Sequence, residues 1–305
     1  MRTPQAPLHS GFGPLTTARE ALGPRRLDGR VAVVTGGYVG VGLETTRVLA
    51  EAGATVIVPA RTAEKARSAI SAIDRVELES LDLFDPASID AFAKRFLASG
   101  RPIHILVNNA GVMATPLRRD ARGFESQLAT NHLGHFQLTA RLWPALLRAG
   151  GARVVSLSSR AHVRSAVDFD DPHFERRPYD KWAAYGQSKT ANALFAVALD
   201  GRGQPRGIRA FSVHPGAVGG TDLMRSMART SEARRSPPRT PYRRSRRPSR
   251  ARPPASGAPR ALSSTGRAAS IARTWTSPCR CRPTSRTRGA CGPGRRIRSW
   301  PSGSG

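Results

Sequence analysis

Two ionisable residues are spaced so that they can act together in proton transfer. Tyr185 and Lys189 are four residues apart in a segment with helical character, so their side chains are expected on one face of a helix. A free tyrosine has a pKa of about 10 and is a poor proton donor at neutral pH. A neighbouring ammonium group stabilises the phenolate and so lowers the tyrosine pKa. The pair indicates general acid–base chemistry centred on Tyr185.

A glycine-rich turn near the amino terminus indicates a ligand that carries phosphate. The segment TGGYVGVG, residues 35–42, follows the β-branched run RVAVVT and precedes an amphipathic segment. Glycines at 36, 40 and 42 let the backbone turn tightly and approach phosphates, and the following helix offers free N–H groups at its start. A tight turn or close helix packing would also explain such glycines. The position between a first strand and a first helix favours a dinucleotide site.

Strand and helix patterns must position these residues, and they alternate from Arg30 onwards. Apolar, β-branched runs predict strands at residues 30–35, 54–60, 75–80, 103–107, 153–159 and 207–215. Amphipathic segments predict helices at residues 44–52, 63–72, 86–99, 124–147 and 185–199. Apolar strands separated by helices are typical of a parallel sheet covered on both faces. The expected fold class is α/β, a Rossmann-like doubly wound parallel sheet.

Four motifs in chain order resemble those of the short-chain dehydrogenase/reductase family. They are the TGxxxGxG spacing of the glycine turn, Asp82-Leu83 after the third strand, NNAG at residues 108–111 after the fourth, and YxxxK at residues 185–189. The resemblance covers roughly two thirds of the chain. It implies an NAD(P)(H)-dependent oxidoreductase that transfers hydride between nicotinamide and a carbonyl or alcohol, with Tyr185 as acid and base.

The resemblance also implies roles for individual residues. The catalytic tetrad would be Asn131, Ser159, Tyr185 and Lys189. In it Ser159 positions the substrate oxygen, with Ser158 as the adjacent alternative, Lys189 also holds the nicotinamide ribose, and Asn131 supports a water-linked proton path. The expected cofactor-binding set is Gly36, Gly40, Gly42, Arg61, Asp82, Leu83, Asn109, Ala110, Gly111, Tyr185, Lys189, Pro215 and Gly216.

The end of the second strand bears on the choice of cofactor. NAD enzymes usually place an acidic residue there to bind the ribose 2′-hydroxyl, whereas this chain has VPART at residues 58–62. Arg61 would suit a 2′-phosphate, so NADP(H) is favoured over NAD(H). The alternative is that Arg61 is a solvated loop residue.

The expected site departs from the family pattern after the sixth strand, and it contains no recognisable metal ligands. The family's PGxxxT pattern would place threonine at position 220, where this chain has Gly220, with Thr221 one place later. The histidines at 132, 135 and 162 are interpreted as structural, because no ligand spacing with cysteine or carboxylate accompanies them. No metal site is therefore expected.

The amino-acid sequences of three segments are similar to those of the retinol-dehydrogenase-like branch of the family and its bacterial relatives. These segments are ATNHLGHFQLT, SSRAH and YGQSKTANALFA. The similarity implies a small hydrophobic carbonyl or alcohol as substrate. Family members commonly form homo-oligomers through helices and the last strand of the sheet, and no such last strand is recognisable here.

Positive charge is concentrated at the carboxyl end. The net charge is +28, and residues 229–305 contain 20 Arg, no Lys and one acidic residue, Glu232, which gives about +19. This segment has no periodicity and few large apolar residues, a composition typical of disorder. The expected organisation is a lead-in over residues 1–28, a Rossmann-fold domain over 29–228 and an Arg/Pro/Ser-rich tail over 229–305.

Two interpretations of the tail stay open. An Arg-rich arm could bind nucleic acid or anionic lipid through its charge. Alternatively, the reading frame shifts near residues 226–235 of a GC-rich gene. Back-translated and read one base earlier, residues 269–278 permit GVYCEDVDIA, and residues 290–305 permit GVRPWAPDPELAERLW, which has the start and spacing of a helix. The frameshift is favoured, and no specific nucleic-acid partner is expected.

The compartment and the rival functions follow from the same features. All three cysteines lie in the tail, no apolar run approaches the ~20 residues of a membrane span, and no signal peptide is recognisable, so a cytoplasmic location is expected. The main hypothesis is an active NADP(H)-dependent oxidoreductase. The alternatives are a catalytically impaired dinucleotide-binding protein and, ranked last, a nucleic-acid binder acting through the tail.

Overall fold

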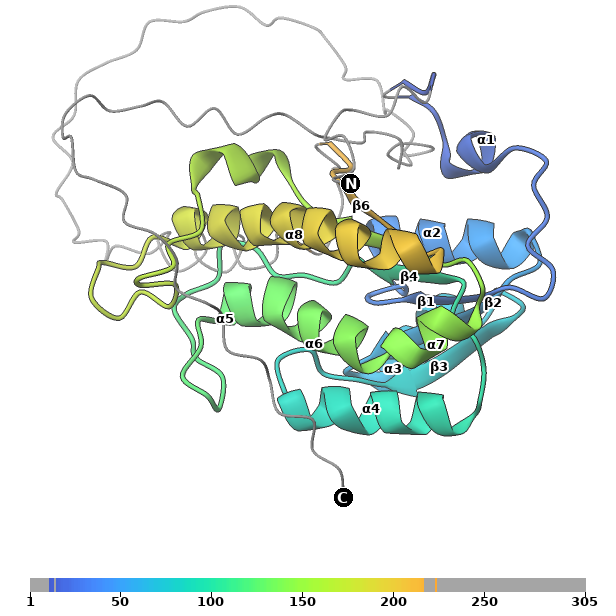
Figure 1. Cartoon of the computed structure of the whole chain (residues 1–305), viewed down its shortest axis with the longest axis horizontal. Coiled ribbons are helices and arrows are strands. Elements are labelled where there is room, and N and C mark those ends of the chain that lie inside the picture. Colours follow the sequence, from blue (N-terminus) through green and yellow to red (C-terminus); the bar gives the residue numbers. More distant parts are fainter. Residues whose placement is uncertain (1–10, 14, 217–222, 224–305) are drawn as a thin grey trace, which may run out of the picture.

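One parallel sheet forms the centre of the molecule (Figure 1). The computed structural model describes residues 11–13, 15–216 and 223. The strand order is β3-β2-β1-β4-β5-β6, and every pairing is parallel. The strands are β1 (Val31–Val34), β2 (Thr55–Ala60), β3 (Val76–Ser80), β4 (Ile105–Asn108), β5 (Arg153–Leu157) and β6 (Arg209–Val213). This order confirms the Rossmann-like, doubly wound fold expected from the sequence.

Helices cover both faces of the sheet. They are α1 (Ala18–Leu22), α2 (Gly40–Glu51), α3 (Ala63–Ile70), α4 (Pro86–Ala98), α5 (Ser126–Leu128), α6 (Gly134–Arg141), α7 (Trp143–Arg148) and α8 (Lys181–Gly203). Alternate residues of β1 serve separate cores, since Val31 and Val33 pack towards α4, α6 and α8, while Ala32 and Val34 pack towards α2 and α3. Burial on both faces explains why the strands read as continuous apolar runs.

The direction of winding reverses beside β1. The chain moves outward from β1 through β2 to β3, returns across the sheet, and then continues from β4 through β5 to β6. At such a switch point the loops after two adjacent strands diverge and leave a crevice at the carboxyl ends of the strands. The loops after β1 and β4 are the glycine turn and the NNAG segment, so both candidate cofactor motifs lie at this crevice.

The sequence prediction of one long helix over residues 124–147 was wrong. The segment is divided into α5, a π-helical turn η1 (Ala129–Leu133), α6 and α7. Gly134 starts α6 where its backbone meets the Leu83 carbonyl, because a Cβ atom there would lie 2.4 Å from that oxygen. A new helix, α7, begins after Leu142 with Pro144 in its first turn, since proline cannot donate the backbone hydrogen bond that a continuous helix needs. Hydrophobic periodicity carried no sign of the π-helical turn.

The lead-in contributes one short helix that packs on the domain. The α1 helix has a capping box, in which Thr17 and Glu20 exchange side-chain and backbone hydrogen bonds. Arg19 forms an ion pair with Glu51 at the end of α2. The predictions made for positions 220 and 221, for the cysteines, for the last strand and for residues 229–305 lie outside the described residues.

Candidate active site

The glycine turn between β1 and α2 requires glycine at specific positions. Gly36 and Gly40 have φ of +64° and +55°, the left-handed region that favours glycine. A Cβ atom on Gly42 would lie 2.3 Å from the Gly36 carbonyl oxygen and 2.5 Å from Asn109 Nδ2. The first residue before α2, Val39, gives no side-chain hydrogen bond to the helix start. The turn can therefore receive a diphosphate at free N–H groups of α2.

Thr35 ties this turn to the NNAG segment after β4. Its Oγ1 atom accepts hydrogen bonds from the backbone N–H groups of Asn109 at 2.9 Å and Ala110 at 3.0 Å. The Asn109 side chain donates in return to the Thr35 carbonyl at 2.8 Å. Thr35 was not recognised from the sequence as a site residue, although its place at the head of TGGYVGVG was the available signal. Hydrogen bonds thus hold the two loops together at the carboxyl end of the sheet.

Three expected cofactor-binding residues, Arg61, Asp82 and Leu83, follow the ends of two adjacent strands. Ala60 of β2 pairs with Ser80 of β3, so Arg61 and Asp82 follow neighbouring strand ends. The Arg61 side chain is exposed, and Asp82 Oδ1 accepts a hydrogen bond from the Phe84 N–H at 2.9 Å. Leu83 is buried against Gly134. Arg61 is thus free to meet solvent or a charged group at this end of the crevice.

Helix α8 brings Tyr185 and Lys189 to the carboxyl end of β5. Asp180 caps the helix by accepting from Trp182 N at 2.9 Å and Ala183 N at 2.6 Å. Tyr185 and Lys189 are each 4% exposed, and Lys189 Nζ lies 5.7 Å from the centre of the tyrosine ring. These two predicted site residues therefore share one face of α8, as their spacing indicated.

The predicted lowering of the Tyr185 pKa was wrong in direction. Burial raises the pKa of Tyr185, and its hydrogen bond with Ser159 opposes this only in part. Lys189 is not among the groups that shift the Tyr185 pKa. Its Nζ donates to the Leu157 carbonyl at 3.0 Å, and burial lowers the pKa of Lys189 itself to about 8. Desolvation of the phenolate therefore determines the direction of the Tyr185 shift.

The two adjacent serines after β5 differ in their surroundings. Ser158 is buried, and its hydroxyl donates to the Lys189 carbonyl at 2.8 Å. Ser159 is partly exposed, begins the 3₁₀ turn η2 (Arg160–Arg164), and accepts from Ala161 N at 3.2 Å. Of the two, Ser159 is the one whose hydroxyl interacts with Tyr185 and lowers its pKa. The geometry favours Ser159 over Ser158 as a substrate-facing hydroxyl.

Asn131 lies beside the lysine in the π-helical turn η1. Its side chain accepts from Val112 N at 2.8 Å and donates to the Val112 carbonyl and to Ser188 Oγ, each at 3.0 Å. A Cβ atom on Gly111 would lie 3.0 Å from Asn131 Oδ1 and 3.6 Å from Lys189 Nζ. The NNAG segment, the asparagine and the lysine therefore meet at one point. π-Helical turns frequently occur at functional sites.

One residue near the lysine was missed by the sequence analysis. Asn192, one turn beyond Lys189 on α8, donates to the same Leu157 carbonyl at 3.0 Å, and its Oδ1 lies 3.2 Å from His132 Nδ1. Its helical offset from Lys189 was the only sequence signal.

The third histidine considered from the sequence, His162, forms a hydrogen bond through Nδ1 with the Ser159 carbonyl of its own turn. Within the part of the chain that the structure describes, no cluster of three His, Cys, Asp or Glu side chains could hold a metal ion.

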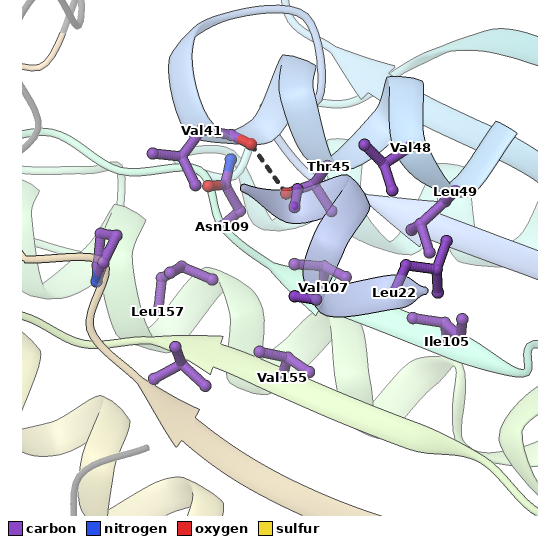
Figure 2. Close-up of a pocket in the computed structure, with 14 residues that line it drawn as sticks. Leu22, Val41, Thr45, Val48, Leu49, Ile105, Val107, Asn109, Val155 and Leu157 are labelled. Atoms are coloured by element: carbon purple, nitrogen blue, oxygen red, sulfur yellow. Dashed lines mark hydrogen bonds between the residues drawn. The ribbon is translucent and has the colours of Figure 1, made fainter. Parts of the chain in front are cut away.

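An apolar cavity of about 250 Å³ extends from the glycine turn along the sheet (Figure 2). Its walls come from α1, α2 and the strands β4 and β5, and residues such as Leu22, Val107 and Val155 line it. The lining includes Asn109 and Pro215, two of the residues expected to bind cofactor. The other expected residue after β6, Gly216, has φ of +80°.

Comparison with known proteins agrees with this geometry. Residues 30–232 match the family described as short chain dehydrogenase. The chain belongs to this family. It is 50% identical over 198 residues to a probable oxidoreductase of Streptomyces lividans, which covers 63% of this chain and 65% of that protein. It is 45% identical over 199 residues to retinol dehydrogenase 12 of mouse, covering 63% of each.

A solved structure extends the comparison to a dinucleotide complex. The Pseudomonas aeruginosa RhlG/NADP active-site complex has a TM-score of 0.55 and 27% identity, over 68% of this chain and 80% of that one. This chain spans less than two thirds of the length of the curated relatives that it matches. The match ends at residue 232, inside the range 226–235 in which the sequence favours a change of frame. No helix among the described residues has the length and apolar content needed to cross a membrane.

Proposed function

We propose that this chain is an NADP(H)-dependent oxidoreductase acting on a hydrophobic carbonyl or its alcohol. The observation that carries the proposal is the meeting of Tyr185, Ser159 and Lys189 at the end of β5, where Lys189 lies beside the NNAG segment. When bound, the nicotinamide supplies or accepts the hydride. The residues of this chain then have to orient the substrate oxygen and transfer its proton.

Tyr185 and Ser159 are the proposed hydrogen-bond donors to the substrate oxygen during reduction. The Tyr185 hydroxyl is protonated at neutral pH, and burial raises its pKa. A protonated hydroxyl can donate to the carbonyl oxygen as negative charge develops there. Ser159 can donate a second hydrogen bond to the same oxygen, which stabilises that charge. Lys189, whose pKa is about 8, is charged below that pH and can return a proton towards Tyr185.

The cofactor fits the cradle made by the glycine turn and the NNAG segment. Side chains at Gly36 or Gly42 would collide with Ala110 or Asn109, so glycine at these positions lets the turn pack directly on the NNAG segment. A turn built of glycines also leaves its backbone N–H groups uncovered for phosphates. The exposed Arg61 at the end of β2 supports a 2′-phosphate and hence NADP(H). We expect Arg61→Ala to weaken NADPH binding about tenfold while NADH binding changes less than twofold. Tighter binding of NADH than NADPH by the unaltered protein would contradict the assignment.

The substrate class rests on the relatives. The probable oxidoreductase and mouse retinol dehydrogenase 12 match this chain over 198 and 199 residues. A hydrophobic aldehyde or ketone, or the matching alcohol, is therefore the proposed substrate. The cytoplasmic location stays a prediction from the sequence.

Turnover of a carbonyl panel tests the proposal. The full chain is mixed with NADPH and with retinaldehyde, a medium-chain aldehyde or an aromatic ketone, and the loss of NADPH absorbance is followed. We expect turnover that Tyr185→Phe lowers by about 10²–10⁴-fold with an unchanged Kd for NADPH. NADPH binding without turnover of any carbonyl would instead favour a catalytically impaired dinucleotide-binding protein. An unchanged rate in Tyr185→Phe would remove the tyrosine from the chemistry.

A further inference from the structure

A buried histidine joins the glycine turn to the π-helical turn that carries Asn131. His135 lies in the first turn of α6 and is 2% exposed. Its Nδ1 atom is 2.9 Å from the Asn131 carbonyl oxygen, and its Nε2 atom is 2.9 Å from Thr35 Oγ1. One imidazole ring therefore contacts both halves of the candidate site.

The partners determine which nitrogen of this ring carries the proton. A carbonyl oxygen only accepts, so His135 Nδ1 must donate to Asn131. In a neutral ring Nε2 is then an acceptor, and the Thr35 hydroxyl must donate to it. Thr35 Oγ1 already accepts two backbone N–H groups, so its own proton is the only one it can give. The other acceptor near it, the Val107 carbonyl, is farther away at 3.3 Å.

A charged ring does not suit this arrangement. In the cation both nitrogens donate, and Nε2 would direct a third donor at Thr35 Oγ1. Burial, together with the positive groups Lys189 and His132 that face the ring, lowers the pKa of His135 to about 4, although the hydrogen bond to Asn131 opposes this. Neutral His135 with the proton on Nδ1 thus completes a continuous chain of hydrogen bonds. The chain runs from the NNAG segment through Thr35 and His135 to the Asn131 carbonyl.

We propose that His135 is a positioning residue for the reaction, a bridge that holds the Asn131 turn in place relative to the cofactor-binding glycine turn. The inference rests on the proposed oxidoreductase function. One arm of the bridge, to Thr35, supports the floor beneath the cofactor. The other arm, to the Asn131 carbonyl, fixes the π-helical turn whose side chain lies beside Gly111 and Lys189. The two arms act on different steps, and this makes them separable.

Two substitutions remove one arm each. His135→Asn keeps an amide donor near the position of Nδ1 but cannot reach Thr35, so we expect the Kd for NADPH to rise about tenfold. His135→Gln places its amide near the position of Nε2 and loses the Asn131 arm. We expect it to lower kcat about tenfold while the Kd for NADPH stays within twofold. A purely structural role would change both quantities together in both variants.

His104 offers a matched control at the opposite end of the sheet. Its Nδ1 accepts a hydrogen bond from Val31 N at 3.0 Å at the start of β1. We expect His104→Gln to lower thermal stability while leaving both kcat and the Kd for NADPH within twofold of the unaltered protein. Equal changes in His104→Gln and in both His135 variants would overturn the proposal.

The tautomer provides a test that needs neither cofactor nor turnover. In the full chain labelled with ¹⁵N-histidine, NMR correlation of ring nitrogens and protons distinguishes the two neutral forms. We expect the proton of His135 on Nδ1 and that of His104 on Nε2, because His104 Nδ1 is an acceptor. A His135 proton on Nε2, or a charged ring at neutral pH, would refute the bridge. If the protein fails to bind NADPH but shows the expected tautomers, the proposed function fails and the bridge stands.

Discussion

Replacing Gly42 with alanine should damage the cofactor cradle in a way that can be worked out from the structure. The new Cβ atom would lie 2.3 Å from the Gly36 carbonyl oxygen and 2.5 Å from Asn109 Nδ2, whereas ordinary contacts are 3.4–4 Å. The neighbours must therefore move by about 1 Å, a displacement that overpacked sites resist. The Gly36 oxygen belongs to the backbone of the turn. Asn109 is held by its 2.8 Å hydrogen bond to the Thr35 carbonyl.

Two costs add up to the expected effect of Gly42→Ala. Forcing the turn and α2 apart costs about 1–3 kcal/mol, by analogy with small-to-large changes in packed cores. Losing the Asn109 hydrogen bond costs about 1 kcal/mol. We expect the free energy of unfolding to fall by about 2–4 kcal/mol in total. Because the displaced groups form the phosphate cradle, the Kd for NADPH should also rise by at least about tenfold.

Urea unfolding and NADPH fluorescence titration measure these two quantities, with Gly201→Ala as the matched control. Gly201 lies in α8, and a Cβ atom there would meet nothing within 4 Å. Alanine in place of glycine in a helix should raise the free energy of unfolding by up to about 1 kcal/mol. Cofactor binding should not change in this variant. Gly42→Ala with the stability and NADPH affinity of the unaltered protein would refute the close-packed cradle.

Three further predictions concern the catalytic residues and the reading frame. Ser159→Ala should lower kcat about 10²-fold without changing the Kd for NADPH. Ser158→Ala should mainly lower the free energy of unfolding, by about 1 kcal/mol, because it loses the hydrogen bond to the Lys189 carbonyl. Equal losses of kcat in the two variants would contradict the choice of Ser159 over Ser158. Folding lowers the pKa of Lys189 from 10.5 to about 8, so the unfolded chain binds more protons between these values. The free energy of unfolding should therefore rise with pH between pH 8 and 10.5. The rise should be about 3 kcal/mol larger in the unaltered protein than in Lys189→Met. Urea titrations that show no such difference would count against a buried lysine. Sequencing the genomic DNA across codons 220–240 should reveal a base gained or lost, and an intact frame would make the Arg-rich tail genuine.

The sequence by itself was sufficient for features that depend on short-range spacing. The alternation of apolar runs and amphipathic segments predicted six strands close to where they lie, because both faces of each strand had to be apolar. The glycine turn was recognisable because its backbone excludes side chains at specific positions. The four-residue spacing placed Tyr185 and Lys189 on one helix face whatever the remainder of the chain does.

Tertiary structure decided everything that depends on partners distant in the chain. The direction of the Tyr185 pKa shift follows from burial, which the Ser159 side chain opposes only in part. The Lys189 ammonium is bound by the Leu157 carbonyl, 32 residues away in the chain. The choice between Ser158 and Ser159 required knowing which hydroxyl the lysine carbonyl occupies. His135 was interpreted as a structural histidine, because nothing local reveals that its Nε2 atom meets the hydroxyl of Thr35, 100 residues away. Hydrogen bonds and desolvation act through space, and the sequence pattern records only spacing along the chain.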